Sequence, residues 1–309
     1  MEKHKSKGLM VRDVQVGGDA PIVVQSMNNT DTRDVQATLK QIDQLAEAGC
    51  EITRVAIPDK AAALALREIV KYSPIPVIAD IHFQAELAIL ALENNADGIR
   101  INPGNIGSKD KVKAIAELAK EKHIPIRVGV NSGSLDPVIR DSMGGVNANS
   151  MVASALKYCS ILEQFDFTDI CVSIKSSDAM LTIEAYRLLA QKVDYPLHIG
   201  ITEAGTPTEG IIRSAVGIGT LLAEGIGDTI RVSLTADPVL EVDTAYRILK
   251  SLNLRSKGPL LIACPTCGRT EVNLQELAEE VEILLEKIEE PIKVAVMGCP
   301  VNGPGEAKD

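Results

Sequence analysis

Three of the six cysteines lie near the end of the 309-residue sequence, in a pattern that could bind a metal. Cys264 and Cys267 form a Cys-x-x-Cys pair, and Cys299 follows within a Gly-Cys-Pro turn. Neighbouring prolines and glycines turn the backbone, so the three sulfurs can converge on one centre. Three thiolates restrict the candidates to zinc, copper or an iron-sulfur cluster. No histidine follows His198, whereas a turn-rich loop leads to Glu306, so the available fourth ligand is an oxygen.

The other three cysteines, Cys50, Cys159 and Cys171, lie within apolar stretches of helix or strand character. A cysteine in such a stretch usually behaves as a small buried apolar residue. We therefore expect these three to be buried thiols, and no disulfide framework is expected in a chain of this kind.

The composition argues against several classes of function. The net charge is −10, whereas binding to a nucleic acid backbone requires a basic surface. Three Phe, five Tyr and no Trp provide no platform on which bases could stack. No apolar run is long enough to span a bilayer, and the charged N-terminus leads into no signal-peptide core. We therefore expect a cytoplasmic protein.

Strand-like and helix-like stretches alternate eight times along most of the chain. Strands are expected at residues 21–26, 52–57, 76–81, 97–101, 125–130, 168–174, 196–199 and 228–233. Helices are expected at residues 34–48, 60–72, 84–94, 108–122, 149–164, 178–192, 207–223 and 238–251. Residues 11–16 alternate apolar and polar and are followed by a predicted turn at 17–19, so a small hairpin is expected to lead into the first core strand. Thr206 to Glu209 predicts a capping box, and Asp237-Pro238 predicts another helix start.

Eight strand-helix repeats within about 230 residues fit a closed (β/α)8 TIM barrel better than an open doubly wound sheet. The turn after the first strand, residues 27–31, lacks the Gly-x-Gly-x-x-Gly of a dinucleotide site. After a polar linker at 252–258, a small α+β domain is expected to surround the cysteines. Its helix follows Asn273, with a predicted buried face of Leu277, Val281, Leu284 and Ile288. The predicted domains are therefore a TIM-barrel substrate domain, 1–256, and a metal domain, 257–309.

Active sites of such barrels collect where the strands end, so the last inward-pointing residues matter most. Strand alternation directs the following residues to that region: Arg54, Asp80, His82, Arg100, Asn102, Arg127, Asn131, Ser173, Lys175, His198, Thr202, Arg231 and Ser233. Five of these are cations, which indicates a pocket for a small diphosphate. The simpler interpretation is a buried charge layer neutralised by Asp80, Glu203 and Glu51, but the bases outnumber these acids. No phosphate-binding loop for a nucleoside triphosphate is present.

Glu203 lies on a glycine-flanked loop just beyond the seventh expected strand. A carboxyl group there can reach a bound substrate and transfer a proton. His82 and His198 could act in the same way, although an isolated histidine in a barrel is as often structural.

At this point the chain resembles a known family, the bacterial 4-hydroxy-3-methylbut-2-en-1-yl diphosphate synthases. The resemblance covers essentially the whole chain, through the stretches at residues 24–27, 80–83, 100–105, 127–131, 264–267 and 298–306 and the Glu203 loop. It implies a TIM barrel that binds 2-C-methyl-D-erythritol 2,4-cyclodiphosphate and a ferredoxin-like second domain with a 4Fe-4S cluster. It also implies that Cys264, Cys267, Cys299 and Glu306 hold that cluster, and that residues 173–177 contact phosphate. Because the family continues for some tens of residues beyond the glutamate, the second domain is expected to be incomplete here.

The hypothesis that follows is a reductive ring opening and dehydration in isoprenoid biosynthesis. Arg54, Arg100, Arg127, Lys175 and Arg231 would bind the phosphates, with Asn102, Asn131, His198 and Ser233 beside them. Glu203, Asp80 and His82 are the candidate catalytic residues, and the resemblance implies a flavodoxin or ferredoxin as electron donor.

The linker predicts a homodimer. After the last barrel helix, the chain leaves the barrel at the end opposite the active site. The linker that follows has about seven residues and reaches at most roughly 25 Å. We therefore expect the cluster domain of one protomer to close over the barrel of the other, as the resemblance also implies.

Two alternatives are weaker. One is a non-redox barrel enzyme, such as an aldolase or a pterin-type synthase, that acts on a phosphorylated substrate and carries a structural zinc in its tail. The other is a binding module without chemistry, which fits poorly with five cations and a carboxyl group at the barrel exit.

Overall fold

The computed structural model describes residues 3–102, 104–255, 258–285, 288 and 290–299. The chain divides into two compact units, Met1–Ile248 and Leu249–Asp309. The boundary predicted between residues 256 and 257 lies outside the described residues and stays a prediction. In the described part of the chain, no helix is both long and apolar enough to cross a membrane.

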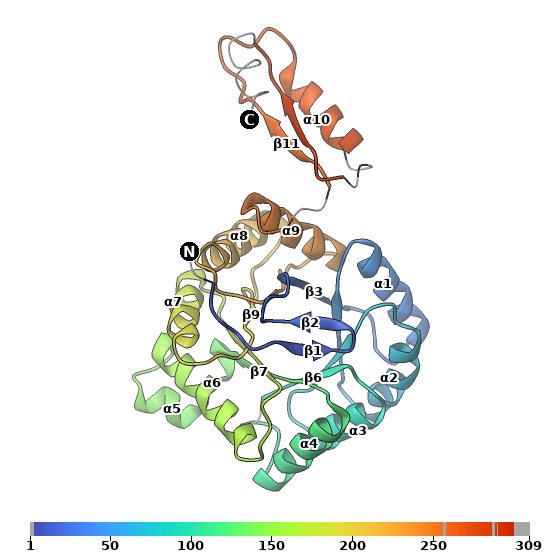
Figure 1. Cartoon of the computed structure of the whole chain (residues 1–309), viewed down its shortest axis with the longest axis vertical. Helices are drawn as coiled ribbons and strands as arrows, with labels where there is room; N and C mark the ends of the chain where they lie inside the picture. Colours follow the sequence, from blue (N-terminus) through green and yellow to red (C-terminus); the bar gives the residue numbers. More distant parts are fainter. Residues whose placement is uncertain (1–2, 103, 256–257, 286–287, 289, 300–309) are drawn as a thin grey trace. The chain divides into compact units, whose positions relative to one another are not determined.

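The first unit is a closed parallel barrel of eight strands (Figure 1). These are β3 (Val23–Met27), β4 (Ile52–Ala56), β5 (Val77–Asp80), β6 (Gly98–Ile101), β7 (Ile126–Asn131), β8 (Ile170–Lys175), β9 (His198–Ile199) and β10 (Thr229–Ile230). The sheet runs in the order β8-β7-β6-β5-β4-β3-β10-β9. A parallel bridge between Val172 of β8 and Leu197, just before β9, closes the circle. The predicted TIM barrel is therefore confirmed.

All eight predicted helices form the ring around the barrel (Figure 1). They are α1 (Val35–Glu47), α2 (Lys60–Tyr72), α3 (Ala85–Glu93), α4 (Lys109–Lys122), α6 (Ala148–Glu163), α7 (Ala179–Ala190), α8 (Pro207–Ala223) and α9 (Pro238–Ser251). Each amphipathic helix buries one face; in α1, for example, Thr38, Ile42 and Leu45 are buried.

Two details of the helices differ from prediction. The segment after β7 contains a 3-10 turn, η1 (Ser132–Ser134), and a short helix, α5 (Pro137–Ser142), neither of which was predicted. Helix α8 begins at Pro207 as expected, but the Thr206 side chain makes no capping hydrogen bond. The predicted capping box is therefore wrong there, and the fixed backbone angle of proline is the remaining local signal for this helix start.

An N-terminal hairpin covers the end of the barrel where the strands begin. Strands β1 (Leu9–Val11) and β2 (Val14–Val16) pair in antiparallel fashion and cross the barrel in Figure 1. Leu9, Val11 and Val16 are buried against the first residues of the barrel strands, such as Val23 and Ile52. A hairpin is present ahead of the barrel, but its turn lies at residues 12–13 and not at the predicted residues 17–19. It forms an apolar floor under the barrel interior.

The described residues of the second unit that follow α9 form two parallel strands and one helix. Strand β11 (Leu260–Ala263) pairs with β12 (Lys293–Val296), and α10 (Leu274–Leu285) packs against β12. The predicted buried face of α10 is wrong, because Leu274 and Leu285 are the buried residues while Leu284 is 63% exposed. A two-stranded sheet covers only a narrow strip of a helix, so most of the apolar side chains of α10 are not covered within this unit.

The floor hairpin gives a direct test of this packing. Leu9→Ala should lower the free energy of unfolding by about 2–3 kcal/mol, because it leaves a cavity under the barrel. Met10 is 49% exposed on the opposite face of the same strand, so Met10→Ala should change that free energy by less than about 0.5 kcal/mol. Urea unfolding measures both values. Equal losses for the two variants would contradict a floor formed by the hairpin.

Candidate functional site

The barrel brings the predicted cations together in its interior. Pairing of neighbouring strands places Asp80, Arg100 and Arg127 side by side on β5, β6 and β7. Lys175 ends β8, and each of the four arginines Arg54, Arg100, Arg127 and Arg231 lowers its pKa. All five cations therefore act on one another inside one lumen, as the sequence predicted.

Asp80 joins two of the arginines at the carboxyl end of β5. Its carboxylate lies 3.4 Å from Nε of Arg54 and 3.2 Å from Nη1 of Arg100. Burial alone would raise the pKa of Asp80, but the Arg54 charge and a hydrogen bond from His82 hold it well below its usual range. Asp80 is therefore ionised. The neighbouring His82 side chain is 55% exposed, so it lies on the outer rim of this group.

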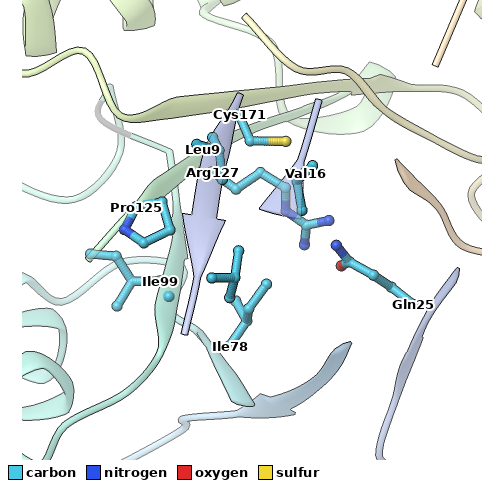
Figure 2. A pocket seen from close by; sticks show the side chains of 10 residues that line it. Leu9, Val16, Gln25, Ile78, Ile99, Pro125, Arg127 and Cys171 are labelled. Carbon is cyan, nitrogen blue, oxygen red and sulfur yellow. The ribbon is translucent and has the colours of Figure 1, made fainter. Parts of the chain in front are cut away.

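Arg127 lies close to the floor hairpin and has no partner in the described part of the chain. It is 4% exposed, and none of its three guanidinium nitrogens has a hydrogen-bond partner among the described residues. Figure 2 shows the guanidinium pointing toward Gln25, beside a cavity of about 20 Å³ above the floor hairpin. Burial lowers the pKa of Arg127 to about 10, and the Arg100 charge adds to this effect. A buried cation without a partner is costly, which is the signature of a group arranged for a ligand.

Lys175 is held close to the same group. Its Nζ would lie 2.9 Å from a side-chain carbon at position 200, so Gly200 is the residue that leaves room for it. Burial lowers the pKa of Lys175 well below its usual value, and the nearby arginines lower it further. Among the described residues, no carboxylate lies within ion-pair distance of its ammonium group.

His198 and Asn102 are two further buried polar residues, each with one nitrogen that has no partner among the described residues. His198 is fully buried, with Nε2 unpaired, and burial followed by the surrounding cations lowers its pKa well below the usual value. Asn102 accepts a hydrogen bond from the Gly104 backbone, while its Nδ2 has no partner in the described part of the chain. A neutral His198 can accept or donate one hydrogen bond but adds no positive charge.

Arg231, just beyond β10, has a carboxylate partner that the sequence did not reveal. Glu241 of α9 lies 3.2 Å from Nη2 of Arg231 and is itself buried. An acidic residue in the first turn of an outer helix is normally interpreted as an exposed partner of the helix dipole. No feature of the sequence marked this residue as one that reaches inward.

The proposed proton donor, Glu203, lies on the loop after β9. Its backbone has a φ of +52°, a left-handed conformation that costs a non-glycine residue about 1–2 kcal/mol. Neighbouring loops hold this conformation, since Thr202 N donates to Ser176 O and Thr235 N donates to Gly205 O. The Glu203 side chain is exposed, so it does not neutralise the buried cations. Strained residues of this kind are often found at functional sites.

The remaining predicted residues lie around the same end of the barrel. Asn131 ends β7 directly opposite Lys175, and Ser233 follows β10; both are half-buried. Glu51 lies at the start of β4 and accepts a hydrogen bond from Val24 N, which places it at the other end of the barrel. Among the described residues, the five cations thus face two buried carboxyl groups near the strand exits, Asp80 and Glu241.

The three candidate metal-binding cysteines of the second unit follow the carboxyl ends of its two paired strands. Cys264 directly follows β11, and Cys299 follows β12 by three residues. Hydrogen bonds from Cys264 N to Val296 O and from Glu271 N to Gly298 O tie these loops together. A hydrogen bond from the backbone N–H of Arg269 lowers the pKa of Cys267, and a smaller effect comes from a hydrogen bond with the Arg269 side chain. The lowered pKa favours the thiolate.

The ligand set itself stays a prediction. Among the described residues, no group of three His, Cys, Asp or Glu side chains is close enough to hold a metal ion, and Glu306 lies outside those residues. Cys50, Cys159 and Cys171 are buried as expected, and burial raises the pKa of each thiol to about 12.

These features define a class: a TIM barrel with a cation-rich lumen, joined to a small unit that bears three cysteines. A family profile described as the GcpE TIM-barrel domain matches residues 6–246, and one described as the GcpE protein C-terminal domain matches residues 260–309. The chain belongs to the GcpE family.

Curated relatives carry the same two parts. A 4-hydroxy-3-methylbut-2-en-1-yl diphosphate synthase (flavodoxin) from Ruminiclostridium cellulolyticum is 57% identical over 309 residues, which cover 100% of this chain and 88% of that protein. A protein of the same name from Geobacter sulfurreducens is 58% identical over 307 residues, covering 99% of this chain and 87% of the relative. The family recognised from the sequence motifs is therefore confirmed.

Solved structures of other barrels share the fold alone. Dihydropteroate synthase from Yersinia pestis superposes with a TM-score of 0.58 at 12% identity, over 81% of this chain and 99% of that chain. A 3-dehydroquinate dehydratase from Geobacillus kaustophilus gives 0.56 at 14% identity, over 83% and 100% of the two chains. These likenesses support the TIM barrel and carry no information on the reaction.

The lowered pKa of Lys175 predicts that binding of a diphosphate takes up a proton. A bound anion raises the pKa of Lys175 again, so the complex keeps a proton that the free protein loses as the pH rises. Affinity for inorganic pyrophosphate should therefore fall more steeply with rising pH in the wild type than in Lys175→Met. That variant should also bind about 10-fold to 100-fold more weakly, because it loses a charged hydrogen bond.

Titration calorimetry in buffers with different ionisation enthalpies measures the proton uptake. The titration of pyrophosphate itself cancels in the comparison of variants. Lys113 is an exposed lysine on α4 that pairs with Glu117, so Lys113→Met is the matched control and should leave the pH profile unchanged. Identical profiles for wild type and Lys175→Met would show that Lys175 does not contact the anion.

Proposed function

We propose that this protein is a 4-hydroxy-3-methylbut-2-en-1-yl diphosphate synthase. It opens the ring of 2-C-methyl-D-erythritol 2,4-cyclodiphosphate reductively and removes water, giving (E)-4-hydroxy-3-methylbut-2-enyl diphosphate. The similarity to relatives of that name, which extends over the whole chain, supports this reaction. The observation that carries the proposal is the excess of buried cations in the lumen, above all the unpaired Arg127. A diphosphate supplies the negative charge that this lumen lacks.

In this proposal the two phosphates of the substrate lie among the five cations. Arg127 contributes three unpaired nitrogens at the bottom of the lumen, and Lys175 contributes a point charge beside it. Asp80 forms ion pairs with Arg54 and Arg100 and so orients both guanidinium groups. Its catalytic contribution is therefore electrostatic rather than proton transfer. The unpaired groups of Asn102 and His198 suit the hydroxyl and ring oxygens of the substrate. Asn131, Ser233 and His82 complete the rim.

The second unit is proposed to hold a 4Fe-4S cluster through Cys264, Cys267, Cys299 and Glu306. The thiolates fit this group in chemistry and in chain topology, since the three cysteines follow the carboxyl ends of two paired parallel strands. When bound, the cluster supplies the two electrons that the ring opening requires. The names of the relatives indicate a flavodoxin as the electron donor, and a ferredoxin is the alternative of the same class.

Glu203 is proposed to deliver the proton that lets the substrate hydroxyl leave as water. Glu203 follows β9, at the end of the barrel where the strands exit, and this place in the chain supports the proposed role. The strained backbone at this residue supports a role in which its direction matters. The proposed location of the enzyme is the cytoplasm.

The reaction can be tested together with Glu203. Anaerobically prepared protein should contain iron and acid-labile sulfide and should convert the cyclic diphosphate when a chemical reductant is supplied. Glu203→Gln should keep the iron, the sulfide and the pyrophosphate affinity but lose about 100-fold or more in kcat, as expected for a general acid.

Glu209 is an exposed glutamate in the first turn of α8, so Glu209→Gln is the matched control and should turn over normally. Wild-type turnover in Glu203→Gln would remove Glu203 from the reaction. Zinc without sulfide in the wild type would instead favour the non-redox alternative.

The homodimer remains part of the proposal and has its own test. If each site combines the barrel of one protomer with the cysteine unit of its partner, a Cys299→Ser protein mixed with a Glu203→Gln protein should regain activity. Random exchange of subunits should restore about a quarter of wild-type turnover, since half of the dimers are mixed and each has one intact site. Complete absence of activity in the exchanged mixture would show that both parts of the site come from one protomer.

A further inference from the structure

Glu241 belongs to an outer helix but lies inside the barrel wall. It is the fourth residue of α9 and only 2% exposed. Its Oε1 accepts a hydrogen bond of 2.9 Å from Leu234 N, and its Oε2 accepts one of 3.0 Å from Ser26 Oγ. Ser26 is a buried residue of β3, and Leu234 lies in the loop between β10 and α9. The carboxylate therefore connects three parts of the fold where the strands end.

Arg231 is the third partner of this carboxylate. Its Nη2 lies 3.2 and 3.3 Å from the two carboxylate oxygens, and its Nε lies 3.4 Å from Oε2. Glu241 thus occupies the Nε–Nη2 edge of the planar guanidinium group. No hydrogen-bond partner is found for Nη1 among the described residues, so the opposite edge is open for another acceptor.

Arg231 and Arg127 differ in their surroundings, and this difference explains why Arg231 needs a carboxylate partner. Arg127 is 4% exposed and has no hydrogen-bond partner among the described residues, whereas the side chain of Arg231 is 18% exposed. A long flexible side chain in that position needs a fixed acceptor to keep one direction. Glu241 is itself fixed by Ser26 and Leu234, so it can provide that direction.

We propose that Glu241 is a positioning residue that orients Arg231 for the anionic substrate. It binds one edge of the guanidinium group and presents the other edge to a phosphate oxygen. The inference rests on the proposed function of the lumen as a diphosphate site. The glutamate places a negative charge near the anion, so its benefit must come from orientation and must be lost when Arg231 is absent.

A double-mutant cycle tests this with inorganic pyrophosphate as the probe. Glu241→Gln keeps the size of the side chain but replaces one acceptor with an amide NH2, which cannot accept from Arg231. In the wild-type background this change should weaken pyrophosphate binding about 3-fold to 10-fold, and Arg231→Met should weaken it by about 10-fold or more. In the Arg231→Met background, Glu241→Gln should cause no weakening, because the group that it orients is missing.

A matched control distinguishes positioning from general stability. Asp97 is also a carboxylate that accepts a backbone hydrogen bond, from Val77 N at 2.8 Å, and pairs with an arginine, Arg12, at 3.8 Å. It lies just before β6, at the opposite end of the barrel. Asp97→Asn should lower the stability in urea but leave the pyrophosphate affinity unchanged.

Ser26→Ala is a second variant in case Glu241→Gln folds poorly. It removes the hydrogen bond that fixes Glu241 and should weaken pyrophosphate binding in the same direction but less, again only when Arg231 is present. Equal weakening by Glu241→Gln in both backgrounds, or none in either, would overturn the positioning role. If Arg231→Met binds pyrophosphate as well as the wild type, the proposal that Arg231 is part of the diphosphate site is wrong.

Discussion

The mutual repulsion of cations inside the barrel is the constraint on which the rest of the structure depends. Arg54, Arg100, Arg127, Lys175 and Arg231 lie within one lumen, and burial together with their neighbours lowers the pKa of several of them. Asp80 and Glu241 offset part of this charge through direct ion pairs. Such an arrangement is stable only if the surrounding fold supplies the free energy to hold it, and it favours any small polyanion that enters.

The fold supplies that free energy in two ways. The floor hairpin covers the end of the barrel where the strands begin with Leu9, Val11 and Val16, and Arg127 lies buried above it. In addition, close contacts between the cationic side chains and the backbone of neighbouring strands fix the orientation of the cations. A side-chain carbon at position 129 would lie 2.4 Å from Nε of Arg100, so this arginine can cross β7 only because residue 129 is glycine. Substrate-sized anions can therefore meet several charges that are already oriented.

Much of this arrangement could be predicted because parallel strands have a strict alternation of two residues. Alternation, combined with the eight strand-helix repeats, correctly placed Arg54, Arg100, Arg127 and Lys175 in the interior. The depth of each residue could not be predicted, since it depends on the stagger between strands. Arg127 is opposite Arg100 in register, yet it lies beside the floor cavity.

The residues that prediction missed belong to helices. Glu241 looks like an ordinary acid in the first turn of an outer helix, and only the way α9 meets β3 and β10 turns it inward. The prediction of the buried face of α10 was wrong for a related reason. The narrow sheet beside this helix leaves only Leu274 and Leu285 buried, and not the wider apolar stripe. Helix periodicity shows which side chains share a face, but not how much of that face the neighbouring elements cover.

A crystal structure of the anaerobically prepared protein with the bound cyclic diphosphate would test the central claim most directly. The account predicts phosphate oxygens within hydrogen-bond distance of Arg127 and Lys175, with Arg231 still paired to Glu241. Phosphates bound outside the lumen, with the Arg127 guanidinium still without an anionic partner, would contradict it.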